Sequence, residues 1–352
     1  MLVGVDAGAF LSRPNISLGQ QDTTSRMFEQ KPGLDVYLCA PRGFCAGVSR
    51  AVETVELALK TYGAPIYVRH HIVHNRHVIQ SLQAKGAIFV EELSEIPDNQ
   101  ARVIFSAHGV PPAVESEATR RGMFIVDASC PLVKKVHREA EGYYKLGYEV
   151  VLIGHRGHPE VIGILGQLPA GAITLIVDVA AAKSFSPRSG IKLAYVTQTT
   201  LSIYDVAEIV RILEQRFPTI TGPRKSDVCY ATTNRQSAVK MIAPLVDAII
   251  VIGSPASSNS QRLREVASSE GCARTLLIED VSQLDWTLLD RTSRLGLTAG
   301  ASVPELLVER LLDALAERFS LKVETVTTAS EDGISFALPK ALLTDARGGG
   351  AR

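Results

Sequence analysis

Short apolar segments alternate along the chain with longer amphipathic segments. The apolar segments span about four to seven residues, as buried parallel strands do, and the amphipathic segments span about 10 to 16, as connecting helices do. Strands that alternate with helices in this way build parallel sheets covered by helices. The pattern therefore predicts an α/β protein.

The same series of four strand-containing units occurs three times. Each series has a strand followed by a cysteine and a helix, a strand with a polar loop and a helix, a strand with an acidic end, and a strand with a small or polar loop and a helix. In that order the units are residues 35–59, 123–144 and 226–245; 66–82, 149–165 and 248–267; 87–96, 172–182 and 274–284; and 102–118, 192–210 and 294–311. We therefore expect three similar small parallel-sheet α/β domains around a pseudo-threefold axis.

The cysteines of the first kind of unit set the expected domain boundaries. Cys45 and Cys130 are 85 residues apart, and Cys130 and Cys229 are 99 residues apart. The expected domains cover residues 34–129, 130–225 and 226–338, and the first strand with the Cys45 loop is a candidate to pack with the third domain. Residues 1–33 and 339–352 are expected to be flexible extensions.

Each predicted domain contributes one cysteine at the carboxyl end of a strand, where ligands bind in open parallel sheets. A single cysteine in such a turn is typical of a small buried apolar residue, but three at matching positions indicate a shared ligand. Gly43 and Gly47, in PRGFCAG, would let the backbone pass close to a bulky group held by Cys45. The other two cysteines, Cys39 and Cys272, have no repeated place, and we assign them to packing.

Three widely spaced thiolates restrict the choice of metal. Thiolates select zinc, copper(I) or iron–sulfur clusters, and the paired spacing of structural zinc sites is absent from the sequence. Iron–sulfur clusters normally take four cysteines. Ligation by Cys45, Cys130 and Cys229 would therefore leave a [4Fe–4S] cluster with one open iron, and loss of that iron would give [3Fe–4S].

Polar loops supply a candidate pocket for an anion. The segment SSNS, residues 257–260, opens a predicted helix, and helix amino termini bind anions, although Ser and Asn are equally the preferred helix caps. The segment SVPE, residues 302–305, fits a capping box. With two histidines these groups would bind phosphate without lysine or arginine; the set is His74, His108, Ser257, Ser258, Asn259 and Ser302.

A candidate proton donor follows in the segment GHRGHPEV. Glu160 comes two residues after His158 and lies in a predicted first helical turn. A carboxylate there is either stabilised by the helix dipole alone or acts as a general acid. Thr199, in the segment QTT, would bridge such a carboxylate to a substrate.

Composition and charge exclude several classes of protein. The 352 residues are 46% hydrophobic, and 37 Lys and Arg balance 37 Asp and Glu, so neither a nucleic-acid groove nor an anionic membrane surface is indicated. The apolar runs are shorter than the roughly 20 residues that span a bilayer. Five scattered cysteines do not form a disulfide framework. We expect a cytoplasmic protein, with organelle targeting by residues 1–33 as the alternative.

Nine stretches of the chain together resemble one family. They lie in the same order as that family's motifs and extend from about residue 34 to residue 338: PRGFCAGVSRAV, APIYVRHHIVHNRHV, FSAHGV, DASCPLVKKVH, IGHRGHPEV, TQTTLS, GPRKSDVCYATTNRQ, GSPASSNSQRL and LTAGASVPE. The chain resembles the LytB family of 4-hydroxy-3-methylbut-2-enyl diphosphate reductases.

The resemblance implies an activity, a cofactor and partners. It implies an iron–sulfur oxidoreductase of the non-mevalonate isoprenoid pathway that converts its allylic diphosphate into isopentenyl and dimethylallyl diphosphates, with ferredoxin or flavodoxin as electron donor and a cloverleaf arrangement of three domains. Carried onto this chain, it implies cluster ligands Cys45, Cys130 and Cys229, a proton source Glu160 assisted by Thr199, and a substrate pocket of His74, His108, His158, Ser257, Ser258, Asn259 and Ser302.

Two other functions remain open on the sequence alone. A zinc hydrolase would use His155, His158 and Glu160 with a remote third ligand, although H-x-x-H-x-E differs from the H-E-x-x-H motif of zinc hydrolases. A non-catalytic anion-binding or redox-sensing protein would hold a cluster without turnover.

Overall fold

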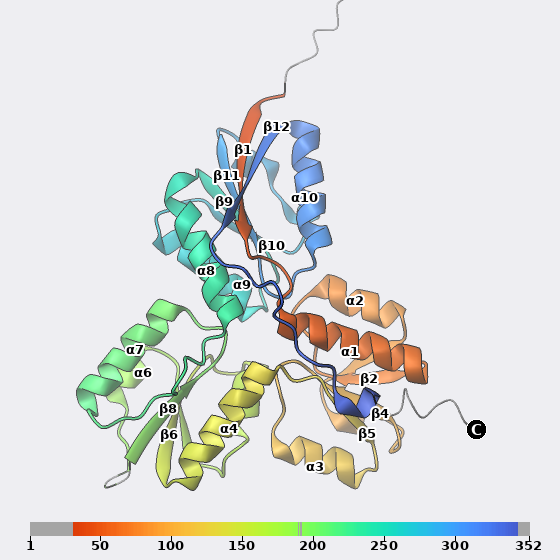
Figure 1. Cartoon of the computed structure of the whole chain (residues 1–352), viewed down its shortest axis with the longest axis vertical. Helices are drawn as coiled ribbons and strands as arrows, with labels where there is room; N and C mark the ends of the chain where they lie inside the picture. The colour runs from red at the N-terminus through yellow and green to blue at the C-terminus, as the bar shows by residue number, and fades with distance from the viewer. Residues whose placement is uncertain (1–30, 189, 191, 344–352) are drawn as a thin grey trace, which may run out of the picture. The chain divides into compact units, whose positions relative to one another are not determined.

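Three parallel sheets carry the fold in the computed structural model, which describes residues 31–188, 190 and 192–343 (Figure 1). Their strand orders are β10-β9-β11-β1-β12, β3-β2-β4-β5 and β7-β6-β8. The strands are β1 (Gly33–Ala40), β2 (Ile66–Arg69), β3 (Ala87–Val90), β4 (Arg102–Phe105), β5 (Phe124–Asp127), β6 (Tyr148–Ile153), β7 (Ile173–Ile176), β8 (Lys192–Thr197), β9 (Ala248–Ile252), β10 (Thr275–Ile278), β11 (Arg294–Ala299) and β12 (Ser320–Thr327). The expected α/β class with three small parallel sheets is confirmed.

Helices connect the strands as the apolar periodicity predicts. The α-helices are α1 (Ala46–Tyr62), α2 (Arg76–Ala84), α3 (Pro112–Arg120), α4 (Pro131–Lys145), α5 (Pro159–Leu165), α6 (Val179–Ser184), α7 (Ile203–Arg216), α8 (Tyr230–Ile242), α9 (Ser258–Ser269) and α10 (Glu305–Arg318), and the 3-10 helices are η1 (Leu93–Glu95), η2 (Ala243–Leu245), η3 (Val281–Gln283) and η4 (Trp286–Leu289). In the described part of the chain, none of them is long and apolar enough to cross a membrane.

The first and the last described strands, β1 and β12, belong to the same sheet. In Figure 1 the red strand β1 runs beside the blue strand β12, and it pairs in parallel with β12 along its whole length and with β11 from Asp35 to Leu38. The two sheets correspond at this point, because β1 lies next to β11 in one sheet as β5 lies next to β4 in the other. The Cys45 loop consequently leaves the same sheet that contains β9, β10 and β11.

The third cysteine unit departs from the expected pattern. We expected a strand before Cys229, but residues 222–229 contain none, and only an isolated bridge between Thr221 and Ala194 marks where a strand would pair with β8. The segment GPRKSD is polar and contains Gly and Pro, which disfavour a central strand. The sheet of β6, β7 and β8 therefore has three strands.

The segment after β12 is packed where we expected a flexible tail. It crosses to the sheet of β2–β5, where Leu342 is fully buried in a core that also contains Ala51 and Ile104. This corrects our expectation for residues 339–343, since an apolar side chain held in a core is not in a free tail. Residues 344–352, and residues 1–30 of the expected amino-terminal extension, lie outside the described part of the chain.

Each helix that follows a cysteine packs on the next sheet rather than on the sheet it leaves. Helix α1 packs on β2, α4 packs on β6 and β8, and α8 packs on β1 and β11. Their buried faces join the corresponding cores, with Ala51, Val55 and Ala58 from α1, Val136 and Ala140 from α4, and Ala238, Val239 and Ile242 from α8. The three cysteines therefore lie where the chain passes from one sheet to another.

Candidate active site

Three helices begin directly after Cys45, Cys130 and Cys229, which occupy their N-cap positions. The backbone N–H of each cysteine donates to a carbonyl oxygen in a neighbouring strand-end loop. The acceptors are Ala301 after β11 (3.3 Å), Ala107 after β4 (2.9 Å) and Thr199 after β8 (3.0 Å). These loops belong to the fourth kind of unit in the sequence repeat, so equivalent hydrogen bonds hold all three cysteines.

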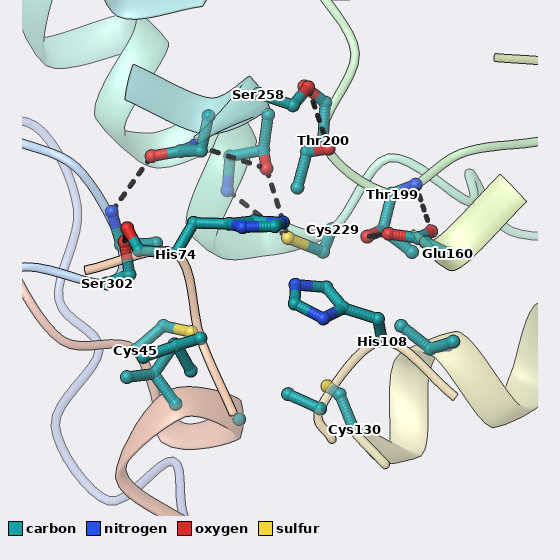
Figure 2. Close-up of a pocket in the computed structure, with 18 of the residues that line it drawn as sticks. Cys45, His74, His108, Cys130, Glu160, Thr199, Thr200, Cys229, Ser258 and Ser302 are labelled. Atoms are coloured by element: carbon teal, nitrogen blue, oxygen red, sulfur yellow. Dashed lines mark hydrogen bonds between the residues drawn. The ribbon is translucent and has the colours of Figure 1, made fainter. Parts of the chain in front are cut away.

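The three cysteines line one cavity of about 110 Å³. Figure 2 shows the three cysteines near the imidazoles of His74 and His108, with Cys229 beside the His74 ring and the other two cysteines on the side of the rings away from Ser258 and Thr200. The structure brings every residue of the predicted site to this cavity: Cys45, His74, His108, Cys130, His158, Glu160, Thr199, Cys229, Ser257, Ser258, Asn259 and Ser302. Among the described residues that line it there is no lysine or arginine.

Gly47 leaves the space between two of the sulfurs. A Cβ atom at Gly47 would lie 2.7 Å from Cys130 Sγ and 3.8 Å from Cys45 Sγ, so these sulfurs are no more than about 6.5 Å apart. Gly43 has a different role from the one we expected. Its φ of +63° suits glycine, and a Cβ there would meet the Val303 carbonyl at 3.0 Å, so Gly43 serves a backbone contact.

Burial opposes ionisation of the cysteine thiols. It raises the pKa of Cys130 to about 12 and that of Cys229 to about 11. A thiolate at either position needs positive charge beside it, which a bound metal supplies. In the described part of the chain, no three His, Cys, Asp or Glu side chains are grouped to hold a single metal ion.

Glu160 is a buried acid held by one residue. Only 2% of Glu160 is exposed. Its Oε1 atom accepts a hydrogen bond from the Thr199 N–H at 2.7 Å, and its Oε2 atom accepts one from Thr199 Oγ1 at 2.9 Å. Burial raises the pKa of Glu160 to about 7 despite these hydrogen bonds. The carboxyl group can therefore hold a proton near neutral pH and give it up, as a general acid must.

These contacts also bear on the zinc alternative. The His158 Nδ1 atom accepts from the Glu160 N–H at 3.1 Å, and both carboxylate oxygens of Glu160 are occupied by Thr199. Two of the residues named for that alternative, His158 and Glu160, thus already make hydrogen bonds within the protein.

Three histidine rings are grouped at the cavity. The ring centroids of His74 and His108 are 4.4 Å apart, and His158 lies 5.5 Å from His74 and 5.7 Å from His108. Burial lowers the pKa of His74 to about 4 and of His158 to about 3, and lowers the pKa of His108 well below its ordinary value. The Nε2 atom of His74 is buried and has no hydrogen-bond partner among the described residues. This atom is thus free to meet a ligand.

Hydroxyl and amide groups complete the side of the cavity opposite Cys130. Ser257 caps α9, whose first turn carries Ser258 and Asn259. The amide oxygen of Asn259 accepts from the Ala301 N–H at 2.9 Å, and the Ser302 hydroxyl donates to the His74 carbonyl at 3.1 Å. A helix amino terminus beside small hydroxyl groups is suited to bind phosphate oxygens.

Among the lining residues that were not singled out from the sequence, two carry hydroxyl groups. Thr200 donates to the Ser258 hydroxyl at 3.0 Å, and Thr232 places its Oγ1 3.2 Å from the Cys229 sulfur. The spacing C-x-x-T around Cys229 matches a capped first turn and could have indicated Thr232. The carbonyls of Ala107 and Ala301 had no such signal, because backbone acceptors leave no mark on residue type.

Sheets and cavity together define a class of α/β protein in which thiols from three helix starts share a pocket with an acid and an anion loop. The chain belongs to the LytB protein family, whose model matches residues 36–316. It is 60% identical to 4-hydroxy-3-methylbut-2-enyl diphosphate reductase 2 of Rhodopseudomonas palustris, over 90% of this chain and 98% of the relative.

Solved structures agree with this family. The E-1-hydroxy-2-methyl-but-2-enyl-4-diphosphate reductase from Plasmodium falciparum is similar with a TM-score of 0.86 at 38% identity, over 91% of this chain and 100% of that one. A second, (E)-4-hydroxy-3-methyl-but-2-enyl diphosphate reductase, the terminal enzyme of the non-mevalonate pathway, has a TM-score of 0.57 at 32% identity, over 81% of this chain and 99% of that one.

Proposed function

We propose that this chain is a 4-hydroxy-3-methylbut-2-enyl diphosphate reductase of the non-mevalonate pathway. The reaction removes the allylic hydroxyl of (E)-4-hydroxy-3-methylbut-2-enyl diphosphate with two electrons and two protons, and it releases water with isopentenyl or dimethylallyl diphosphate. The observation that carries this proposal is the single cavity in which three cysteines, a buried acid and an anion loop meet. The names of its relatives support the same activity.

The cavity fits an iron–sulfur cofactor. Three sulfurs face it from three helix starts, and Gly47 keeps the volume between two of them clear. We propose a [4Fe–4S] cluster held by Cys45, Cys130 and Cys229 with one open iron, which becomes [3Fe–4S] when that iron is lost. When bound, such a cluster supplies electrons and a Lewis-acidic site for an oxygen ligand.

The protein's own groups position the substrate and move its protons. The diphosphate is anchored by the start of α9 together with Ser302, His74 and His108. Anchoring removes the translational freedom of the small hydrocarbon and fixes its orientation in the cavity. Glu160, held by Thr199, donates a proton to the departing hydroxyl oxygen. His158 lines the same space and caps the helix that carries Glu160.

Three further features belong to this proposal. The equivalent hydrogen bonds from the three cysteine N–H groups support a pseudo-threefold, cloverleaf arrangement of the sheets.

A ferredoxin or flavodoxin is the proposed electron donor, because the reaction consumes electrons that the substrate does not supply. The proposed location is the cytoplasm.

The function is tested with protein purified without oxygen. It should be brown, contain about four irons per chain and oxidise a reduced mediator only when the allylic diphosphate is added. A colourless protein that contains zinc would support a hydrolase instead. A brown protein that leaves the substrate unchanged would contradict the proposed activity.

Gly47→Ala should lower the iron content of the purified chain. The new methyl group would lie 2.7 Å from Cys130 Sγ, closer than any tolerated contact, so the sulfur must move. Gly142→Ala is the matched control, because Gly142 is also helical and a Cβ there meets no atom within 4 Å. The control should keep its iron and gain roughly 0.5–1 kcal/mol of stability. Equal iron content in both variants would mean that Gly47 does not border the cluster.

Binding of inorganic pyrophosphate should be coupled to proton uptake at His74. Burial lowers the pKa of His74 to about 4, and the negative ligand raises it again, so the imidazole gains a proton as the anion binds. Calorimetry at pH 7 in two buffers of different ionisation enthalpy measures this uptake. His74→Gln should take up fewer protons and bind about tenfold more weakly. Identical proton uptake by the two proteins would remove His74 from the anion pocket.

A further inference from the structure

Each of the three cysteine helices carries a basic side chain five or six residues after its cysteine. These residues are Arg50 on α1, Lys135 on α4 and Arg235 on α8. None of them lines the cavity. Each instead contacts the few residues that directly precede another of the three cysteines.

Arg50, on the helix that follows Cys45, contacts the segment before Cys130. Its guanidinium donates to the Ser129 carbonyl at 3.0 Å and to the Asp127 carbonyl at 3.3 Å. Its Nε also donates to the Ala337 carbonyl at 2.7 Å, so Arg50 contacts the segment that follows β12 as well.

Lys135, on the helix that follows Cys130, contacts the segment before Cys229. Its Nζ lies 2.7 Å from Asp227 Oδ1 and donates to the Lys225 carbonyl at 2.8 Å. The other carboxylate oxygen of Asp227 accepts from the Thr197 N–H at 2.9 Å. This is the segment in which the expected strand is absent, so side-chain contacts take the place of a sheet ladder.

Arg235, on the helix that follows Cys229, contacts the segment before Cys45. It is fully buried, and it donates to the Gly43 carbonyl at 2.8 Å and to the Phe44 carbonyl at 3.5 Å. Glu331 balances its charge at 2.9 Å. The three contacts therefore close a circle, from Cys45 to Cys130, from Cys130 to Cys229 and from Cys229 back to Cys45.

We propose that Arg50, Lys135 and Arg235 are positioning residues that form a cyclic clamp, in which the helix of each cysteine holds the next cysteine at the distance the cofactor requires. The proposal rests on the proposed function, because the cofactor is what demands a fixed spacing. Hydrogen bonds from a charged donor are about twice as strong as neutral ones. Three such contacts between sheets therefore restrict the relative movement of the three sulfurs.

The clamp predicts which cysteine each substitution releases. Full-length protein reconstituted with iron and sulfide is treated with a chelator and iodoacetamide together, and mass spectrometry follows alkylation of each cysteine. Lys135→Gln should speed the alkylation of Cys229 about tenfold, the effect of losing hydrogen bonds to a charged group, and leave Cys45 within about twofold. Arg50→Gln should release Cys130 in the same way, and Arg235→Gln should release Cys45.

Two control variants separate the clamp from general destabilisation. Lys145→Gln removes the same charge from the exposed end of the same helix, where Lys145 pairs only with Glu141 among the described residues, and it should behave as wild type. Lys135→Arg keeps the charge and should keep Cys229 protected. Equal acceleration at all three cysteines, or none, would overturn the clamp. Failure of the wild-type chain to take up iron would instead overturn the proposed function, since alkylation can still be followed without iron.

Discussion

Cys229→Ser should abolish reductase activity and leave the purified chain without a stable cluster. A serine hydroxyl is a poor ligand for iron compared with a thiolate, and only two of the three cysteines that line the cavity would remain to hold the proposed cluster. Iron and sulfide content per chain, measured after purification without oxygen, checks this prediction. Cys45→Ser and Cys130→Ser should behave alike, because equivalent hydrogen bonds place all three cysteines.

Cys272→Ala is the matched control for these cysteine variants. Cys272 is buried at 2% exposure in the core around α8 and α9 and does not line the cavity. Its substitution should cost some stability, as removal of a small buried side chain does, but iron content and colour should remain. Wild-type iron content in Cys229→Ser would contradict the ligand assignment, whatever the activity.

Glu160→Gln should lower kcat by roughly 10²-fold or more with little change in KM. The amide preserves the size of the side chain and can still meet Thr199, but its N–H protons are not acidic enough to be transferred, and loss of a general acid typically costs 10² to 10⁴ in rate. Steady-state kinetics with a reduced mediator measures the effect. Thr199→Ser is the control, because it keeps the hydroxyl that donates to Glu160 Oε2. Near-normal turnover in Glu160→Gln would remove Glu160 from this role.

The same substitution should stabilise the chain at alkaline pH. Below about pH 4.5 the carboxyl is protonated in both the folded and the unfolded chain, so it makes no difference to stability. As the pH rises towards 7, only the unfolded chain ionises, and above pH 7 the folded chain carries the full cost of a buried charge. The rise in pKa from 4.5 to about 7 corresponds to about 3 kcal/mol.

Denaturant titrations of both proteins at pH 5 and pH 8 test this trade-off. Glu160→Gln should gain unfolding free energy relative to wild type at pH 8, and much less at pH 5. A variant that is less active and less stable at both values would show that the substitution damaged the cavity, so its loss of rate could not be assigned to the proton.

The repeat in the sequence predicted the class of fold because it depends on local features. Each unit of a strand, a cysteine and a helix with one buried face is encoded by about 25 consecutive residues, as in residues 35–59 and 123–144. Loops at the carboxyl ends of parallel strands must meet at one edge. The set of residues at the cavity therefore followed from the order of the units and from the resemblance to a known family.

Features that depend on distant pairing were not predictable in this way. Strand β12 is largely exposed and has a mixed apolar and polar pattern, and it forms because β1, nearly 290 residues earlier, offers it an edge. Leu342 is buried only because its segment crosses to another sheet. The missing strand before Cys229 is the reverse case, because contacts from Lys135 hold this segment although it forms no strand.

The place of β1 inside the last sheet affects how the protein matures during synthesis. Of the described strands, β1 is made first, and both of its edges lack their partners until β11 and β12, between Arg294 and Thr327, have been made. Cys45 follows β1 in the sequence, so it can reach its final position only after nearly the whole chain has been made. The proposed cluster, with Cys45 as one of its ligands, would therefore be inserted only after most of the chain has been made, because a nascent chain that ends before residue 294 lacks both partners of β1.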